Sequence, residues 1–234
     1  MRYALGLAAA AILALPAGSS AQAPTRGSAV IVPRAGYINY SKSTGIKPAP
    51  FVGVDLMYNL TRFFSVGPSL MVSQPETNGE DFGAALIYGD TTYLFRVTQP
   101  LTVFNASLNA SAKLPTYGRV SPFITGGVGY YTLYLDPQVS NGSKRFGRMS
   151  LNASAGAAFR FNKNTGIELS VGDMIFTDND RNRLNPVTTA FQNRFAEEFP
   201  VESSNSKTAH NLVFGLGFTF TPSGTIETDE EDKK

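Results

Sequence analysis

The sequence predicts an all-β fold, an eight-stranded antiparallel up-and-down transmembrane β-barrel with short periplasmic turns and long extracellular loops. Three observations predict it. An apolar targeting segment opens the chain, apolar and polar residues alternate along most of the remainder, and short and long connections alternate. No later stretch approaches the roughly 18 consecutive apolar residues of a membrane helix. The exported chain is therefore predicted to cross a membrane with strands.

The first residues have the layout of a secretory signal peptide. Arg2 supplies a positive charge, 4–15 is apolar but too short to cross a bilayer, and 16–23 is rich in small residues. We expect cleavage after Ala21 rather than after Ala23, because Pro24 would be a poor first residue. The predicted organisation is a signal peptide, a short N-terminal segment, a barrel and an acidic periplasmic tail, at 1–21, 22–26, 27–221 and 222–234.

Composition excludes several classes of function. Charged residues make up 16% of the chain and the formal net charge is +2, so nothing indicates a nucleic-acid partner. The chain has no cysteine, which excludes disulfides, a thiolate nucleophile, a Cys-ligated metal and a lipid-modified N-terminal cysteine. It also has no phosphate loop, nucleophile elbow or metal-ligand spacing, so we expect neither a cofactor nor a metal.

Period-two alternation predicts the eight strands. The alternation is clearest in 148–161, 102–114, 209–221 and 51–60, and weaker in 29–40, 63–74, 119–134 and 166–176. Tight turns are expected at 60–63, 114–119 and 162–166, and long connections at 41–50, 75–99, 135–147 and 177–208. Short turns at one end and long loops at the other are typical of outer-membrane barrels.

The polar face of these strands separates a membrane barrel from a soluble, lipocalin-like one. A face in water would be dense in Lys and Glu, whereas this one is Gly, Ser, Asn and Thr with a few isolated charges. The opposite face is Leu, Val, Ile, Phe and Ala. The sequence therefore predicts lipid outside and a narrow, filled lumen inside.

Residues 82–98 are ambiguous. Gly89-Asp90 lies between β-rich flanks, which is a signal for a two-residue hairpin turn. Two additional barrel strands would make ten, but flanks of about seven residues are shorter than the 9–11 that a tilted span needs. We expect an extracellular hairpin instead.

A lumen charge network is predicted from the polar face. Its members should pair, because an unpaired charge inside the barrel would be costly; the alternative is solvation by lumen water near the periplasmic rim. If Phe161 opposes Ile167, Arg160 lies opposite Glu168 in a cross-strand pair. The predicted network consists of Arg34, Asp55, Lys113, Arg160 and Glu168.

Two polar residues stand apart from this pattern. Strict alternation places Asp173 on the outward face, which is tolerable near the outer interface or if a bulge at Gly172 turns it inward. His210 is the only histidine and has no neighbouring Ser or carboxylate in the sequence. We expect it to be an interface residue rather than a catalytic base.

The connection at 177–208 breaks the strand pattern. Phe191, Phe195 and Phe199 recur every fourth residue, which predicts a short amphipathic helix over 188–199 at the extracellular mouth, ended by Pro200. The three rings either pack onto neighbouring loops and close the barrel top, or form a lid or contact surface for lipopolysaccharide or a hydrophobic solute. In the second case anionic head groups would meet Arg181, Arg183 and Arg194.

The last predicted strand carries an assembly signal. Gly215 is followed by Phe218 and Phe220, which resembles the signal of bacterial outer-membrane proteins, although Val213 occupies a usually polar position and the strand is not terminal. With 33–37 and 121–130, it makes residues 27–221 resemble the small "outer membrane protein β-barrel domain" family, whose architecture is that of OmpA/OmpX-type and OmpW-like barrels. This resemblance implies the bacterial outer membrane, insertion by the barrel assembly machinery, and contact with outer-membrane lipids and lipopolysaccharide.

Three functions are compatible with these features. The first is a monomeric barrel with a structural or surface-interaction role and no catalysis. The second is a narrow OmpW-like channel for small or hydrophobic solutes. Against it stands the width of an eight-stranded barrel, whose interior is just wide enough for side chains to fill. The third, a lipid-modifying enzyme, lacks the His–Ser pair that such barrels need, since His210 has no such neighbour.

Overall fold

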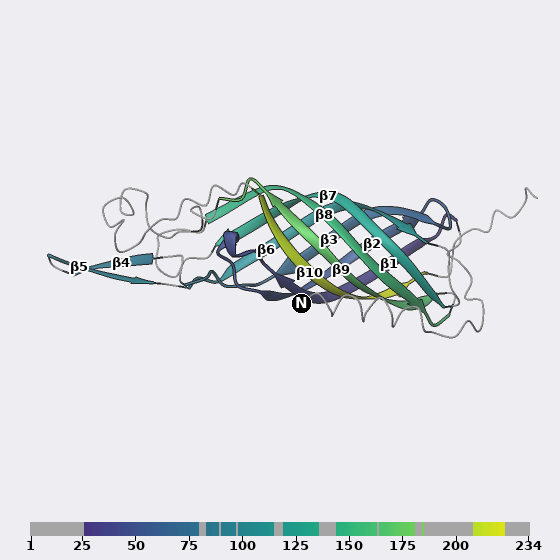
Figure 1. The fold of residues 1–234 in the computed structure, drawn as a ribbon, viewed down its shortest axis with the longest axis horizontal. Helices are drawn as coiled ribbons and strands as arrows, with labels where there is room; N and C mark the ends of the chain where they lie inside the picture. The colour runs from purple at the N-terminus through teal and green to yellow at the C-terminus, as the bar shows by residue number, and fades with distance from the viewer. Residues whose placement is uncertain are drawn as a thin grey trace, which may run out of the picture.

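Eight antiparallel strands close into a barrel, as predicted (Figure 1). The computed structural model describes residues 26–79, 83–88, 90–96, 98–114, 119–135, 144–162, 164–180, 184 and 208–222. The first and last strands pair with each other, so the barrel has no open edge. The barrel strands are β1 (Ala29–Asn39), β2 (Ala49–Asn59), β3 (Phe64–Ser73), β6 (Leu101–Lys113), β7 (Val120–Leu135), β8 (Lys144–Arg160), β9 (Thr165–Thr177) and β10 (Thr208–Phe220).

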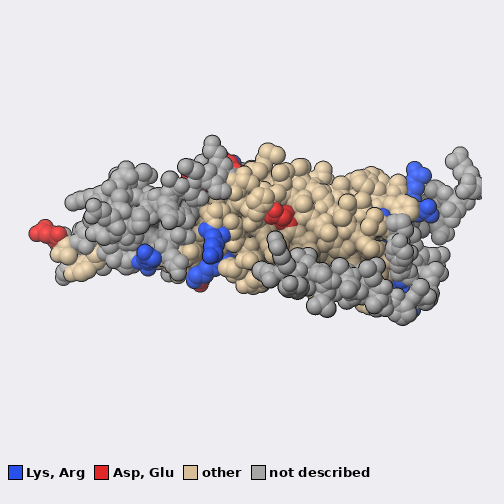
Figure 2. Space-filling model, viewed as in Figure 1, with Lys and Arg blue, Asp and Glu red and all other residues tan. Residues whose placement is uncertain are grey.

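The outer surface of the barrel is apolar. Large side chains at alternate positions point outward, with Val52 64% and Leu108 62% exposed. On the face that Figure 2 shows, Lys and Arg gather toward the two ends and the middle is almost free of charge. Closing the sheet satisfies the backbone hydrogen bonds between neighbours, so such a surface can face lipid. No helix in the described residues is long and apolar enough to span a membrane.

The connections give the barrel two different ends. The short-turn end carries the connections at 60–63, 114–119 and 161–164, and the long-loop end carries those at 40–48, 74–100, 136–143 and 178–207. The predicted boundaries differ from the observed ones by up to four residues, and the largest difference lies at the start of β8. β7 and β8 stay paired up to Leu135 opposite Lys144, so the connection predicted at 135–147 is shortened to 136–143.

The ambiguous segment near residue 90 is a separate hairpin. β4 (Gly83–Tyr88) and β5 (Thr91–Arg96) form their own two-stranded sheet, with Tyr88 opposite Thr91 across a two-residue turn. Figure 1 shows this hairpin projecting beyond the long-loop end of the barrel. The prediction of a hairpin rather than two extra barrel strands is confirmed.

Three other predicted segments lie outside the described residues. They are the signal peptide at 1–21, the acidic tail beyond Pro222, and the helix at 188–199 with Phe191, Phe195 and Phe199. Each stays a prediction.

A closed barrel of this kind is expected to resist detergent until it is heated. Unboiled mature protein should therefore run faster on a denaturing gel than boiled protein, because the closed sheet stays compact and unfolds slowly. Equal mobility of the two samples, or recovery of the chain as a soluble protein without detergent, would contradict the fold.

Candidate functional site in the barrel lumen

The lumen holds two layers of inward-facing side chains. Toward the short-turn end lies a charged layer, which contains the predicted network of Arg34, Asp55, Lys113, Arg160 and Glu168. Toward the long-loop end lies a cluster of buried apolar side chains. Both layers are built by alternate residues of the barrel strands, so the register between strands decides which side chains meet.

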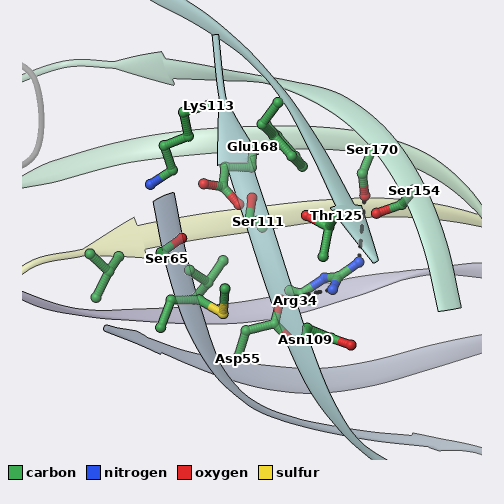
Figure 3. Close-up of a pocket in the computed structure, with 15 residues that line it drawn as sticks. Arg34, Asp55, Ser65, Asn109, Ser111, Lys113, Thr125, Ser154, Glu168 and Ser170 are labelled. Carbon is green, nitrogen blue, oxygen red and sulfur yellow. Dashed lines mark hydrogen bonds and ion pairs between the residues drawn. The ribbon is translucent and has the colours of Figure 1, made fainter. Parts of the chain in front are cut away.

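The charged layer is centred on an ion pair between β1 and β2. Arg34 Nη1 lies 2.8 Å from Asp55 Oδ2, and the two side chains are 23% and 13% exposed. The other carboxylate oxygen, Oδ1, accepts a 2.6 Å hydrogen bond from Ser69 Oγ on β3. Arg34 Nη2 donates to Ser170 Oγ on β9 at 3.5 Å (Figure 3). This pair therefore links four strands across the lumen.

Gly215 on β10 makes room for the guanidinium. A Cβ added there would lie 2.8 Å from Ser170 Oγ and 3.1 Å from Arg34 Nη2. Gly215 thus has a packing reason to be glycine, apart from the assembly signal predicted for it. Phe218 and Phe220, the other members of that signal, point outward and are 45% and 43% exposed. Their role in assembly stays a prediction.

Glu168 lies among the remaining cations of the charged layer. Its carboxylate interacts electrostatically with Lys113, Arg34 and Arg160, and is repelled by Asp55. Figure 3 shows Glu168 and Lys113 in the same part of the lumen. Within the described part of the chain, Glu168 makes no salt bridge of 4.0 Å or less. Glu168 is therefore held by charge at a distance, beside the direct Arg34–Asp55 pair.

The predicted register between β8 and β9 is wrong by two residues. Phe159, not Phe161, opposes Ile167, so Glu168 lies opposite Ala158 and Arg160 opposite Gly166. The cause is the turn: Asn162 Oδ1 accepts hydrogen bonds from the backbone N–H groups of Asn164 and Thr165, both at 2.8 Å. Arg160 and Glu168 still share the inner face, but as diagonal neighbours.

Polar side chains fill most of the middle of the lumen and leave two small cavities between them. Asn105 Nδ2 on β6 donates to Ser150 Oγ on β8 at 2.7 Å, over the inner face of β7 between them. The cavities measure about 40 and 70 Å³ and are lined by the charged layer and its neighbours. Ser65 Oγ and Asn109 Oδ1 line the smaller one without a protein partner, which suits a few bound waters. Such cavities are too small to hold a solute.

An apolar plug closes the lumen toward the long-loop end. Its centre is the stacked pair of Tyr131 and Phe176, whose ring centroids are 3.9 Å apart and which are both 0% exposed. Tyr131 Oη donates to the backbone carbonyl of Thr177 at 3.1 Å, so the one polar atom of the pair is satisfied. The plug consists of Ile38, Tyr40, Ile46, Ala49, Phe51, Leu101, Val103, Tyr131, Leu133, Leu135, Met174, Phe176, Leu184 and Ala209.

Connecting segments complete the plug from above. Tyr40 and Ile46 come from the β1–β2 connection, which contains the 3-10 helix η1 (Lys42–Thr44). Ser41 N donates to Asn211 Oδ1 at 3.0 Å, fastening this connection to β10. Burial raises the pKa of the Tyr40 hydroxyl, so its ring enters the plug uncharged. The mouth is closed by loop residues as well as strand residues.

The plug is the part of the lumen that sequence reasoning missed. The predicted lumen of small polar residues holds for the half that contains the charged layer. At the long-loop end the alternation lapses, because Leu133, Tyr134 and Leu135 are all large and apolar or aromatic. An apolar residue on both faces of a membrane strand is the signal that would have indicated a filled mouth.

The two residues that stood apart from the pattern lie together on the outer surface. β9 runs without a bulge, since Gly172 pairs in register with Ser154 and Val213, and Asp173 faces outward. Its Oδ2 contacts His210 Nδ1 on β10. The histidine thus has a carboxylate partner that its own sequence neighbourhood did not show. No three His, Asp or Glu side chains in the described ranges could hold a metal ion.

Comparisons with known proteins agree with this architecture. Neisserial surface protein A has a similar structure, with a TM-score of 0.54, 9% identity, and coverage of 83% of this chain and 96% of that chain. OprG from Pseudomonas aeruginosa matches with a TM-score of 0.48, 12% identity, and coverage of 86% and 99%. The similarity to Neisserial surface protein A shows a shared fold only.

No curated protein is similar in sequence at a significant level. A model of the outer membrane protein beta-barrel domain matches residues 6–220. With its closed eight-stranded barrel and apolar outer surface, this chain belongs to the outer membrane protein β-barrel domain family and is located in the bacterial outer membrane.

Proposed function

We propose that this protein is a closed outer-membrane barrel with a structural or surface-interaction role. The observation that carries the proposal is the apolar plug. In the layout of this class the long loops are extracellular, so the plug lies at the extracellular mouth and the charged layer nearer the periplasm. A lumen closed at the mouth offers outside solutes no route inward.

The physical basis is the cost of moving a polar solute through the plug. Tyr131, Leu133 and Phe176 are 0% exposed, so no water lies between them. An ion would have to shed its hydration to pass, and a hydrophobic constriction excludes conduction by staying dry. Below the plug, cavities of about 40 and 70 Å³ hold only a few waters.

The extracellular side supports a role at the surface. The β4–β5 hairpin projects beyond the barrel and carries Tyr93, which is 55% exposed. At its base, Lys47 Nζ lies 3.0 Å from Glu76 Oε2, and Ile46 and Thr77 form a bridge between two connections. Contact with lipopolysaccharide or a partner surface would use this side of the molecule, displayed on a rigid barrel.

Conductance in planar lipid bilayers tests this proposal. Wild-type protein is expected to show no steady conductance, whereas the double variant Tyr131→Ala/Phe176→Ala is expected to conduct, because it removes both rings of the central stack. The matched control is Phe214→Ala/Leu216→Ala, which removes two outward side chains and should stay silent. Heat-modifiable mobility verifies that each variant folds.

Steady conductance by the wild type would overturn the proposal and favour the OmpW-like channel. Silence of the plug variant in its folded form would show that the plug is not what closes the lumen.

A further inference from the structure

The two ends of the barrel differ in charge. At the long-loop end both signs occur, and the two ion pairs there have N···O distances of 3.0 and 2.8 Å. Beyond the Arg34–Asp55 pair, the described residues at the short-turn end carry one carboxylate, Glu168, which lies inside the lumen. The cations at this end are Arg26, Arg62, Lys113, Arg119 and Arg160. The short-turn end therefore has an excess of positive charge.

Three of these cations, Arg26, Arg62 and Arg119, form a basic rim around the mouth of the barrel. All three are exposed, and they come from separate parts of the chain: Arg26 precedes β1, Arg62 lies between β2 and β3, and Arg119 precedes β7. Arg62 lies over the ring of Phe63, 4.6 Å from its centroid, which holds the guanidinium at the rim. In Figure 2 this end shows Lys and Arg, and no Asp or Glu among the residues that are not grey.

The segment that follows the barrel has the opposite charge. Residues 223–234 contain five carboxylates and two lysines, and the carboxylates all lie in 227–232. The chain leaves the barrel at the rim itself, because Thr221 N donates to Asn164 O, beside the start of β9, at 2.8 Å. The acidic run thus follows closely on a point that the barrel holds in place.

The basic rim lies within reach of this segment. Eight strands about 4.8 Å apart and tilted near 40° enclose a barrel about 16 Å across. Residues 227–232 follow Thr221 by roughly six to eleven residues, which span up to about 20–36 Å when extended. A single exposed ion pair is weak, but a segment tethered at the rim meets its partners at an effective concentration of about millimolar. Several weak pairs can then form together.

We propose that residues 227–232 dock on the basic rim through ion pairs between their carboxylates and Arg26, Arg62 and Arg119. The docked segment lies across the periplasmic mouth of the lumen, and its negative charge offsets the excess of cations there. Anionic phospholipid head groups offer the same kind of charge, but only the acidic run is tethered to the rim. The docking depends neither on the plug nor on whether the barrel conducts.

The distance between two spin labels, measured by double electron–electron resonance, tests the docking. The chain has no cysteine, so two introduced cysteines carry the only labels. Thr228→Cys places one label in the acidic run. Leu114→Cys places the other after β6, across the barrel from β10, where Leu114 N donates to Pro122 O at 2.8 Å and fixes the backbone.

The mature chain in phosphatidylcholine nanodiscs at low salt is expected to give one narrow distance. About 1 M NaCl should replace it with a distribution about 15 Å broad, because salt screens exposed charges and releases a coil of roughly seven residues.

Two sets of substitutions identify the partners. Neutralising the acidic run should broaden the distance as salt does; the changes are Glu227→Gln, Asp229→Asn, Glu230→Gln, Glu231→Gln and Asp232→Asn. Neutralising the basic rim should have the same effect; the changes are Arg26→Gln, Arg62→Gln and Arg119→Gln. The matched control neutralises three exposed cations at the long-loop end and should leave the distance narrow; the changes are Lys42→Gln, Arg96→Gln and Arg145→Gln.

The substitutions in the acidic run leave the barrel unchanged, so they decide the matter if the rim variant loses its heat-modifiable mobility. A broad distance in the wild type at low salt would overturn the proposal, as would a narrow one that survives neutralisation of the acidic run. Adding phosphatidylglycerol to the nanodiscs should leave the distance narrow. Broadening by this lipid would assign the basic rim to phospholipid head groups and overturn the proposal as well.

Discussion

Replacing Asp55 with alanine is expected to lower the free energy of unfolding of the barrel by about 3 kcal/mol. The substitution leaves the Arg34 guanidinium in the lumen without the carboxylate that lies 2.8 Å away. Removing one partner of a buried pair costs about 3–5 kcal/mol, because the other charge stays desolvated. The low end applies here, since Arg34 is 23% exposed and small cavities adjoin it.

Urea unfolding in lipid vesicles measures this loss, and two further variants identify its cause. Arg34→Met/Asp55→Leu removes both charges and should recover most of the stability, since an apolar pair of similar size is often neutral. Glu76→Ala breaks the Lys47–Glu76 pair, whose side chains are 46% and 60% exposed, and should cost less than about 1 kcal/mol. A double variant as unstable as Asp55→Ala would show that the loss comes from packing rather than from the stranded charge.

The barrel itself could be predicted from the sequence because its physical requirements repeat along every strand. Lipid on one side and a filled lumen on the other impose an alternation that a single chain displays, as in 148–161. The same alternation places Arg34 and Asp55 on one face of neighbouring strands. Their contact then follows because β1 and β2 are consecutive antiparallel strands that pair with each other.

Features that depend on the pairing of distant strands could not be predicted. The hydrogen bonds of Asn162 in one turn shift the register of β8 and β9 by two residues, and this separates Arg160 from Glu168. The partner of His210 lies 37 residues away on another strand. The period-two pattern predicts which face of the sheet each residue occupies, but not its position along the barrel axis. A contact between residues on different strands can be predicted only when both the face and the axial position are known.

The plug escaped prediction for a different reason. Its strand residues have the same chemistry as lipid-facing ones, so a Leu or Phe at the end of a strand gives no sign of which side it serves. Leu133 and Leu135 point into the lumen while Tyr134, between them, is 42% exposed on the outer surface. A lapse of the alternation, as at 133–135, indicates that some apolar side chains face inward, and the structure shows which of them meet the opposite wall of the barrel.

A side chain packed inside the barrel should contribute more to stability than one that faces lipid, and Phe176→Ala tests this. We expect that substitution to lower the free energy of unfolding by about 4 kcal/mol, since removing a fully buried phenylalanine costs about 3–5 kcal/mol. Phe176 is 0% exposed and stacks on Tyr131, and the rigid barrel wall cannot collapse into the space. The loss therefore combines the transfer of the ring with the cavity left behind.

Phe214→Ala on β10 is the matched control. Phe214 is 48% exposed on the lipid-facing surface, where acyl chains can move into the vacated space. Only the transfer of the ring is then lost, which amounts to about 1.5–3 kcal/mol. Urea unfolding in the same vesicles compares the two variants, and the plug variant should be the less stable by about 2 kcal/mol. Equal losses would mean that side chains at the mouth of the lumen fill the vacated space as readily as acyl chains do. The plug would then not be a packed core.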